Sequence, residues 1–263
     1  MWGLIKHLDR LLRGEVTSLE QLRQDRLDIP IVGLSAVVAL LGVIYGACMG
    51  LFAVTGSGSG SVTQIFASMV KVPALFFLTL VVTLPSLYVF NALVGSRLSL
   101  LSMGRLLVGS LAIMLAVLAS LGPIVAFFAV STTSYPFMLL LNLIVYTISG
   151  FLGLMFLLQT LHRINVAQAT PPPLVSDPND PNYIPVLEAD NGGALERIRG
   201  HVLGPHVKTI FRIWLFVFML VGAQMAYVLR PFIGHPSRPF EWFRHREGNF
   251  FQAVWELLKG FFQ

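Results

Sequence analysis

Five apolar stretches, each long enough to cross a lipid bilayer, constrain this chain more than any other feature. A helix rises about 1.5 Å per residue and the hydrocarbon core is about 30 Å thick, so about 20 apolar residues suffice to span it. The stretches are Pro30–Val54, Val72–Val94, Leu106–Val130, Phe137–Leu161 and Thr209–Leu229. Helices satisfy their own backbone hydrogen bonds in lipid. The stretches therefore predict an all-α integral membrane bundle of about five transmembrane helices.

The composition excludes most soluble classes. Hydrophobic residues make up 55% of the 263 residues and charged residues only 12%, about half the ~25% of soluble domains. The net charge is +5, but the basic residues lie at the borders of the apolar stretches. That pattern indicates membrane topology and contact with anionic lipid, and it does not favour nucleic acid. The single cysteine, Cys48, excludes an intrachain disulfide.

The stretches divide the chain into five segments. These are an amphipathic N-terminal segment (1–29), a four-helix transmembrane region (30–161), a Pro-rich strap (162–208), a fifth transmembrane helix (209–229) and a basic and aromatic C-terminal tail (230–263). The strap contains ATPPPLVSDPNDPNYIP, with six prolines and no helical period. Such a composition predicts an extended or disordered connection rather than a folded domain.

Amphipathic helices are predicted at both ends of the chain. Residues 1–13 place their leucines and isoleucine on one helical face, as in a helix that lies in the membrane interface; packing against the bundle is the alternative. Phe250–Phe262 is too short to span. We expect it either to lie in the interface, where Trp and Phe are favoured, or to dock on the bundle. A further amphipathic piece, Val62–Lys71, is expected before the second span.

Four prolines are expected at the starts or in the interiors of the first three spans. Pro30 and Pro73 are expected in the first turns of the first and second spans, where a missing N–H is harmless. Pro85 and Pro123 fall inside their spans and predict kinks.

The lysines and arginines predict the orientation. They are concentrated in the N-terminal segment, in the loop after the second span and in the strap, whereas the loop after the third span has none. The positive-inside rule therefore puts the N-terminus and the strap in the cytoplasm. Five spans then put the C-terminal tail outside, although that tail is itself basic.

Basic residues at the membrane borders are the candidate lipid or anion contacts: Arg199, Lys208, Arg212 and Arg230. Arg212 lies about one turn inside the fifth stretch. We expect it either to extend its charge to the interface beside Lys208 or to build a headgroup site with Lys208 and Arg199. Catalytic, cofactor-binding and metal-binding residues are not predicted. No Asp or Glu occurs between Asp28 and Asp177, and the six histidines lack metal-ligand spacing.

Small residues at four-residue spacing predict close helix packing. They form two rows, Gly42, Gly46 and Gly50 in the first span and Ala112, Ala116 and Ser120 in the third. Such rows let helices approach closely in lipid, either inside the bundle or at an oligomer interface.

Two blocks, LDRLLRGEVTSLEQLRQDRLDIPIVGL at 8–34 and YVLRPFIGHPSRPFEWFRHREGNFFQAV at 227–254, resemble an uncharacterised family of bacterial, planctomycete-like polytopic membrane proteins. The resemblance implies a multi-pass protein of the bacterial inner membrane and transfers no active site. The amphipathic start followed by SMVKVPALFF is also loosely similar to Yip1-type five-span proteins, but Tyr45-Gly46 is followed by Ala47 instead of completing the YGP-type motif of that group.

These patterns predict a non-enzymatic membrane protein that organises or scaffolds a membrane complex or a lipid patch. Its expected partners are membrane lipids and other membrane subunits or a second copy, with no cofactor and no nucleic acid. One alternative is a passive channel or small-solute transporter lined by Asn91, Asn142 and Gln224. A second alternative is a lipid-modifying enzyme, which would have to use His201 or His206 beside Glu196.

Overall fold

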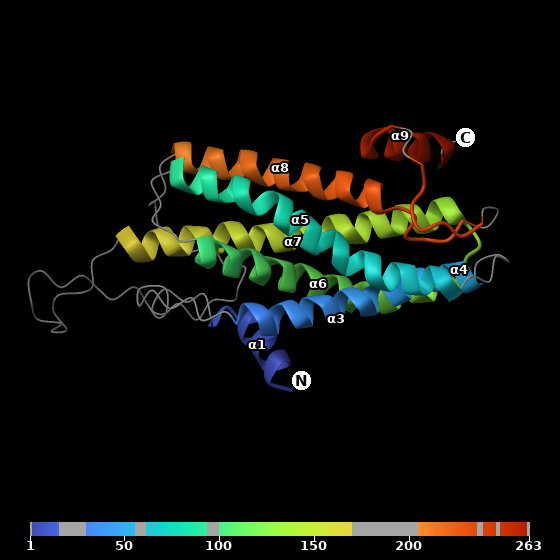
Figure 1. Cartoon of the computed structure of the whole chain (residues 1–263), viewed down its shortest axis with the longest axis horizontal. Helices are drawn as coiled ribbons and strands as arrows, with labels where there is room; N and C mark the ends of the chain where they lie inside the picture. The colour runs from blue at the N-terminus through green and yellow to red at the C-terminus, as the bar shows by residue number, and fades with distance from the viewer. Residues whose placement is uncertain are drawn as a thin grey trace, which may run out of the picture.

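The chain folds as a bundle of long helices (Figure 1). The computed structural model describes residues 2–15, 30–55, 62–93, 100–169, 205–235, 239–245 and 248–261. Its helices are α1 (Trp2–Leu12), α3 (Ile31–Gly50), α4 (Phe52–Thr55), α5 (Val62–Leu93), α6 (Leu100–Ser131), α7 (Tyr135–Ala169), α8 (Pro205–Leu229) and α9 (Phe250–Phe261). No strand occurs within these ranges.

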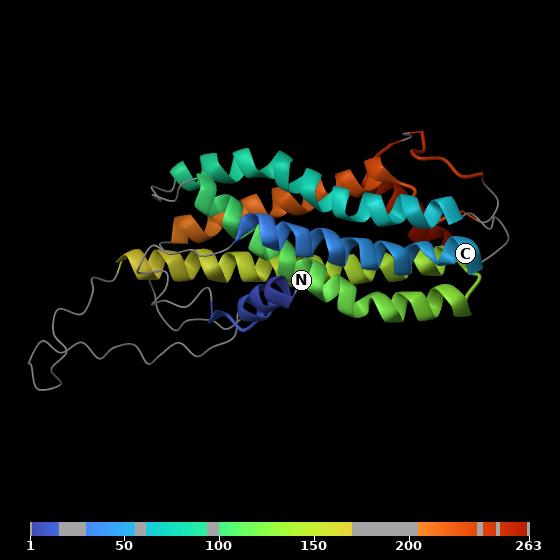
Figure 2. The same cartoon turned by 60° about the horizontal axis from the view of Figure 1, so that its bottom comes forward.

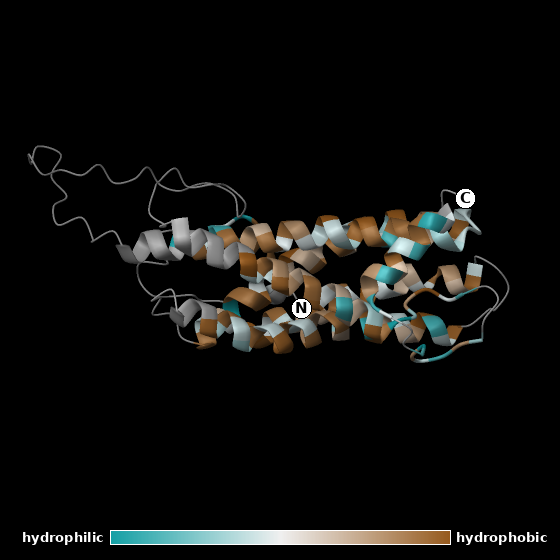
Figure 3. Ribbon diagram, turned by 90° about the horizontal axis from the view of Figure 1, so that it is seen from above, coloured by the Kyte–Doolittle hydropathy of each residue, from teal (hydrophilic) through white to brown (hydrophobic). Residues whose placement is uncertain are grey.

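The predicted all-α membrane bundle is confirmed. Four stretches of helix are long and apolar enough to cross a membrane, namely Ile31–Thr55, Val62–Val89, Leu100–Ser131 and Tyr135–Leu161. A shorter apolar helix, Ile213–Leu229 of α8, lies beside them. Figure 3 shows hydrophobic residues along the whole length of the bundle, with many of the hydrophilic ones gathered towards one end.

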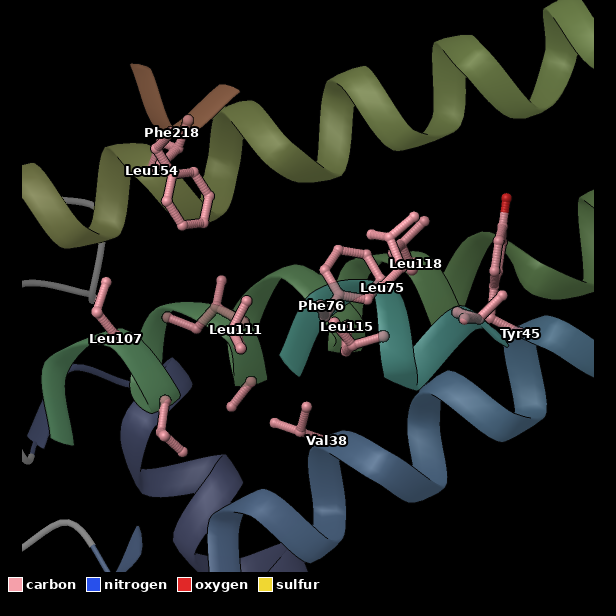
Figure 4. Close-up of a cluster of buried hydrophobic side chains, with 14 of the residues drawn as sticks. Val38, Tyr45, Leu75, Phe76, Leu107, Leu111, Leu115, Leu118, Leu154 and Phe218 are labelled. Atoms are coloured by element: carbon pink, nitrogen blue, oxygen red, sulfur yellow. The ribbon is translucent and has the colours of Figure 1, made fainter. Parts of the chain in front are cut away.

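The helices pack in a chain of neighbours around α3. Helix α3 contacts both α5 and α6, α7 packs on α6, and α8 packs on α5. Figure 4 shows side chains from these helices meeting in the core. Those labelled there are Val38 and Tyr45 of α3, Leu75 and Phe76 of α5, Leu107, Leu111, Leu115 and Leu118 of α6, Leu154 of α7 and Phe218 of α8.

The second spanning helix is longer than the sequence predicted. Helix α5 begins at Val62 and includes the piece that was expected to be separate, so Pro73 is interior to it and not in its first turn. Proline is tolerated there because neighbouring helices in a membrane bundle can compensate for the lost hydrogen bond. Pro73 lies against α3, where a Cβ added to Gly42 would be 3.1 Å from the Pro73 Cβ. Pro85 and Pro123 lie inside α5 and α6, as predicted.

The glycine row of α3 faces α5. A Cβ added to Gly46 would lie 2.8 Å from Met69 Cα, and one added to Gly50 would lie 2.8 Å from Ile65 Cα. The two backbones therefore approach within a distance that only glycine permits. In the second row, on α6, Ala112 is buried, Ala116 is half-buried and Ser120 is exposed, so this row passes from the core to the surface.

The amphipathic helix α1 packs against α3 and α6. Leu11 is buried in the core and Leu8 packs beside it, whereas Leu12 remains exposed. At least part of the apolar face of α1 is therefore docked on the bundle. The strap predicted at 162–208 lies mostly outside the described residues. At its edges, α7 continues to Ala169 and α8 begins at Pro205.

We expect Gly46→Ala to lower the free energy of unfolding by about 1–3 kcal/mol, because the new methyl group would overlap the α5 backbone. Thermal unfolding in detergent measures the change. Gly104→Ala is the matched control in α6, since its nearest neighbour would be Leu84 Cδ1 at 4.0 Å. Equal melting temperatures for the two variants would contradict the close approach of α3 and α5.

Candidate functional site

The C-terminal tail folds back over one end of the bundle. We call residues 230–235 and 239–245 the C-terminal cap. Figures 1 and 2 both place it at the end of the bundle where α3 ends and α5 begins. The cap connects α8 to α9, so a short stretch of irregular chain separates the two helices.

A polar stripe on α5 holds the cap. Gln64, Ser68 and Lys71 are spaced four and three residues apart, which puts them on one helical face. Gln64 Nε2 donates hydrogen bonds to the carbonyl oxygens of Pro231 at 3.2 Å and Phe232 at 3.1 Å. The Ser68 hydroxyl also reaches the Phe232 carbonyl. The stripe therefore supplies donors to backbone carbonyls of the cap.

Lys71 is the centre of this arrangement. The residue is only 3% exposed, and its ammonium donates hydrogen bonds to the carbonyl oxygens of Pro231, at 2.9 Å, and Trp242. The ammonium also lies 5.9 Å from the Trp242 ring centroid and 5.2 Å from that of Phe243. A buried charge is costly unless dipoles or counter-charges surround it. Here carbonyl groups and ring faces of the cap provide that environment.

Arg230 links the beginning of the cap to its end through hydrogen bonds. The Arg244 N–H donates to the Arg230 carbonyl oxygen at 3.2 Å, and Arg230 Nη2 donates to the His245 carbonyl oxygen at 2.9 Å. The Arg230 guanidinium stacks on Tyr227, at 3.8 Å from the ring centroid. Both ends of the cap are therefore tied together at the C-terminal end of α8.

Apolar contacts fit the cap onto the bundle. Ile233 is buried in the core, and a Cβ added to Gly234 would lie 2.6 Å from the Ala53 Cβ of α4. The His235 ring lies 4.6 Å from that of Tyr135 at the start of α7. The cap thus contacts the ends of several helices.

Helix α9 is docked on the bundle and also presents aromatic side chains. The Phe250 N–H donates to Gln224 Oε1 of α8 at 3.2 Å, and α9 contacts α7 and α8. Val254 and Leu258 are half-buried. Phe251 and Trp255, in contrast, are 57% and 61% exposed. Docking and interfacial contact, the two alternatives for this helix, are therefore compatible.

The structure separates the predicted basic contacts. Arg230 lies in the cap, whereas Lys208 and Arg212 lie near the other end of α8, where only their backbone is described. Along α8, Lys208 and Arg230 are about 33 Å apart at about 1.5 Å per residue, so they cannot share a site. Arg199 lies outside the described residues.

Sequence reasoning missed Lys71 and the polar stripe. It placed Lys71 only at the end of the amphipathic piece Val62–Lys71, because the apolar stretch begins at the next residue. The available signal was the spacing of Gln64, Ser68 and Lys71 directly before an apolar span, which puts three donors on one helical face. The carbonyl partners in the tail could not be found from that spacing.

The polar residues of the channel alternative make internal hydrogen bonds. Tyr45 Oη donates to Asn142 Oδ1 at 2.8 Å, and Asn142 Nδ2 donates to the Met138 carbonyl oxygen at 2.8 Å. Gln224 accepts the Phe250 N–H. The side chain of Asn91 is outside the described part of the chain. So are Glu196, His201 and the side chain of His206, on which the enzyme alternative depends.

The architecture is that of a multi-pass helical membrane protein whose tail covers one end of the bundle. Among the described residues, no three His, Cys, Asp or Glu side chains gather in a group that could hold a metal ion. Comparisons of the chain with protein-family models, curated proteins and solved structures find no match.

We expect Gly234→Ala to loosen the cap, because the added methyl group would overlap the Ala53 Cβ. Overpacking of about 1–3 kcal/mol increases the open population at least about fivefold, so trypsin should cleave after Arg244 correspondingly faster. Gly260→Ala is the control in α9, since nothing lies within 4 Å of its added Cβ. Unchanged cleavage in the Gly234 variant would show that the cap does not pack on α4.

Proposed function

We propose that this chain is a non-enzymatic multi-pass membrane protein that organises or scaffolds a lipid patch or a membrane complex around its capped end. One observation carries the proposal. The cap and α9 hold four large aromatic side chains exposed at the same end of the bundle, namely Trp242, Phe243, Phe251 and Trp255.

These aromatic side chains are accompanied by positive charge. Arg244 follows Phe243 directly, and Arg230 begins the cap directly after α8. Aromatic rings are favoured at the boundary between lipid and water, and basic side chains there attract anionic headgroups. The same combination suits a partner protein, because aromatic and arginine side chains dominate protein interfaces.

The rigid support of this surface favours a binding role. The polar stripe of α5 holds the backbone beside Trp242, and the Phe250–Gln224 hydrogen bond fixes the start of α9. Side chains on a fixed backbone lose less conformational entropy when they bind. The internal hydrogen bonds of Asn142 and Gln224 support this role over a conducting path, which needs polar groups that face a pore.

We place the protein in a bacterial inner membrane with the N-terminus in the cytoplasm and the cap on the outer side. The distribution of lysines and arginines supports this orientation, and the resemblance of residues 8–34 and 227–254 to bacterial polytopic proteins supports the location.

Gentle detergent extraction, followed by identification of co-extracted lipids and proteins, tests the proposed function. We expect a defined lipid or partner to accompany the protein. Replacing both Phe251 and Trp255 by Ser should reduce that association at least about tenfold, since burial of one large aromatic side chain contributes about 1.5–3 kcal/mol.

The control replaces two exposed apolar residues away from the cap, Leu12→Ser and Val32→Ser, and should leave the association unchanged. A protein that is extracted alone and conducts ions or solutes in proteoliposomes, with flux lost in Asn142→Ala, would establish the channel alternative instead.

A further inference from the structure

Two arginines of the cap lie near the buried Lys71. Arg244 is bonded through its backbone to the Arg230 carbonyl oxygen, and it lies two residues after Trp242, whose carbonyl accepts from Lys71. Lys71 in turn donates to the carbonyl of Pro231, the residue after Arg230. These contacts bring a lysine from the interior of α5 close to two arginines of the cap, Arg230 directly after α8 and Arg244 further along the tail.

The described residues offer these cations no carboxylate. The ion pairs found among them join Arg10 to Glu15 and Arg13 to Asp9, both near the N-terminus. Glu241 belongs to the cap, but it is exposed and takes part in neither pair. Positive side chains that lie close together and are partly buried repel one another, and a bound anion relieves this repulsion.

The cluster lies where the apolar part of α8 ends. That apolar helix, Ile213–Leu229, ends directly before Arg230. Helices α5 and α8 pack side by side, and the Lys71–Pro231 hydrogen bond puts Lys71 beside this end, although the apolar part of α5 extends to Val62. A headgroup beside the end of α8 therefore lies next to Arg230.

Two of the three cations have unused donors. Arg230 Nε is buried without a hydrogen-bond partner among the described residues. Arg244 is half-buried, and its side chain makes no hydrogen bond or ion pair within the described part of the chain. A guanidinium carries five donors in a planar fork that matches two oxygens of a phosphate. Lys71 is too deeply buried for such a contact, but its charge adds to the field.

We propose that the cap binds a phosphate group through Arg230 and Arg244, beside the buried charge of Lys71. The inference rests on the proposed function, since it names the ligand chemistry of the same capped end. A lipid headgroup and free phosphate both supply this chemistry. The position of Arg230 at the end of the apolar part of α8 favours the headgroup as the source.

The experiment uses the full chain in detergent and compares Arg244→Gln with Lys259→Gln. Both variants remove one positive charge from the same end of the protein, but Lys259 lies outside the cluster. Arg244→Gln keeps the backbone hydrogen bonds of the cap. Thermal unfolding and tryptophan emission check that each variant is folded. Arg244→Lys retains the charge without the planar fork.

In the first arm, the protein is extracted from vesicles of phosphatidylcholine and phosphatidylglycerol, and retained lipid is counted by native mass spectrometry. In the second arm, inorganic phosphate is titrated and bound phosphate is followed by phosphorus NMR. We expect lipid retention by the unmodified protein and by Lys259→Gln, and retention weaker by about fivefold in Arg244→Gln. Lipid retention by Arg244→Lys should lie between that of the unmodified protein and that of Arg244→Gln.

Binding of inorganic phosphate with the same order of variants, without lipid retention, supports the site with free phosphate as the source. Absence of binding in both arms, or equal binding by Arg244→Gln and Lys259→Gln, overturns the proposal. Co-extraction that depends on Phe251 and Trp255 but not on Arg244 overturns the phosphate site alone and leaves the proposed function standing.

Discussion

A lysine ammonium that is buried within a membrane-spanning helix has to be solvated by protein. In this chain the solvating groups are two backbone carbonyls and two aromatic rings of the C-terminal cap, arranged around Lys71. Without the cap the ammonium would face lipid or interfacial water. The burial of one charge on α5 and the folding of a tail more than 150 residues further along the chain therefore depend on each other.

Close packing in the membrane places this lysine. The first part of α5 lies against the glycine row of α3, with Ile65 and Met69 next to Gly50 and Gly46. The polar stripe on the same segment is directed at the cap, so residues 62–71 are held between α3 on one side and the cap on the other. Packing of small residues replaces the hydrophobic driving force between helices in lipid. Here the packing also fixes where the donors of the polar stripe lie along the bundle and that they face the cap.

Much of the fold follows from local sequence signals, because a spanning helix is specified by a single stretch of about 20 apolar residues. The stretches at Leu106–Val130 and Phe137–Leu161 lie within α6 and α7, and the C-terminal helix begins at Phe250, as predicted. The extension of α5 to Val62 was missed because residues 62–71 are polar enough to resemble a surface segment. Their burial depends on the tail, which is remote in sequence.

The candidate site was predictable only in part for the same reason. The sequence predicted a basic and aromatic tail and Arg230 as a lipid or anion contact, but periodicity cannot pair a helix with a distant irregular segment. Pro231, Phe232 and Trp242 bond to α5 through their backbone carbonyls, and every residue has such a carbonyl. The amino-acid types at these positions therefore cannot predict these contacts.

Amide hydrogen exchange across residues 227–245, in the unmodified protein and in Lys71→Met, tests whether the buried Lys71 ammonium holds the cap in place. Methionine fills a similar volume but leaves the Trp242 carbonyl without its lysine donor and the Pro231 carbonyl with Gln64 alone, and an unsatisfied buried carbonyl costs on the order of 1–3 kcal/mol. We expect slow exchange in the unmodified protein, exchange at least about fivefold faster in Lys71→Met, and no change in Lys259→Met. Equal exchange in Lys71→Met and the unmodified protein would show that the cap is held without the buried ammonium, contrary to this expectation.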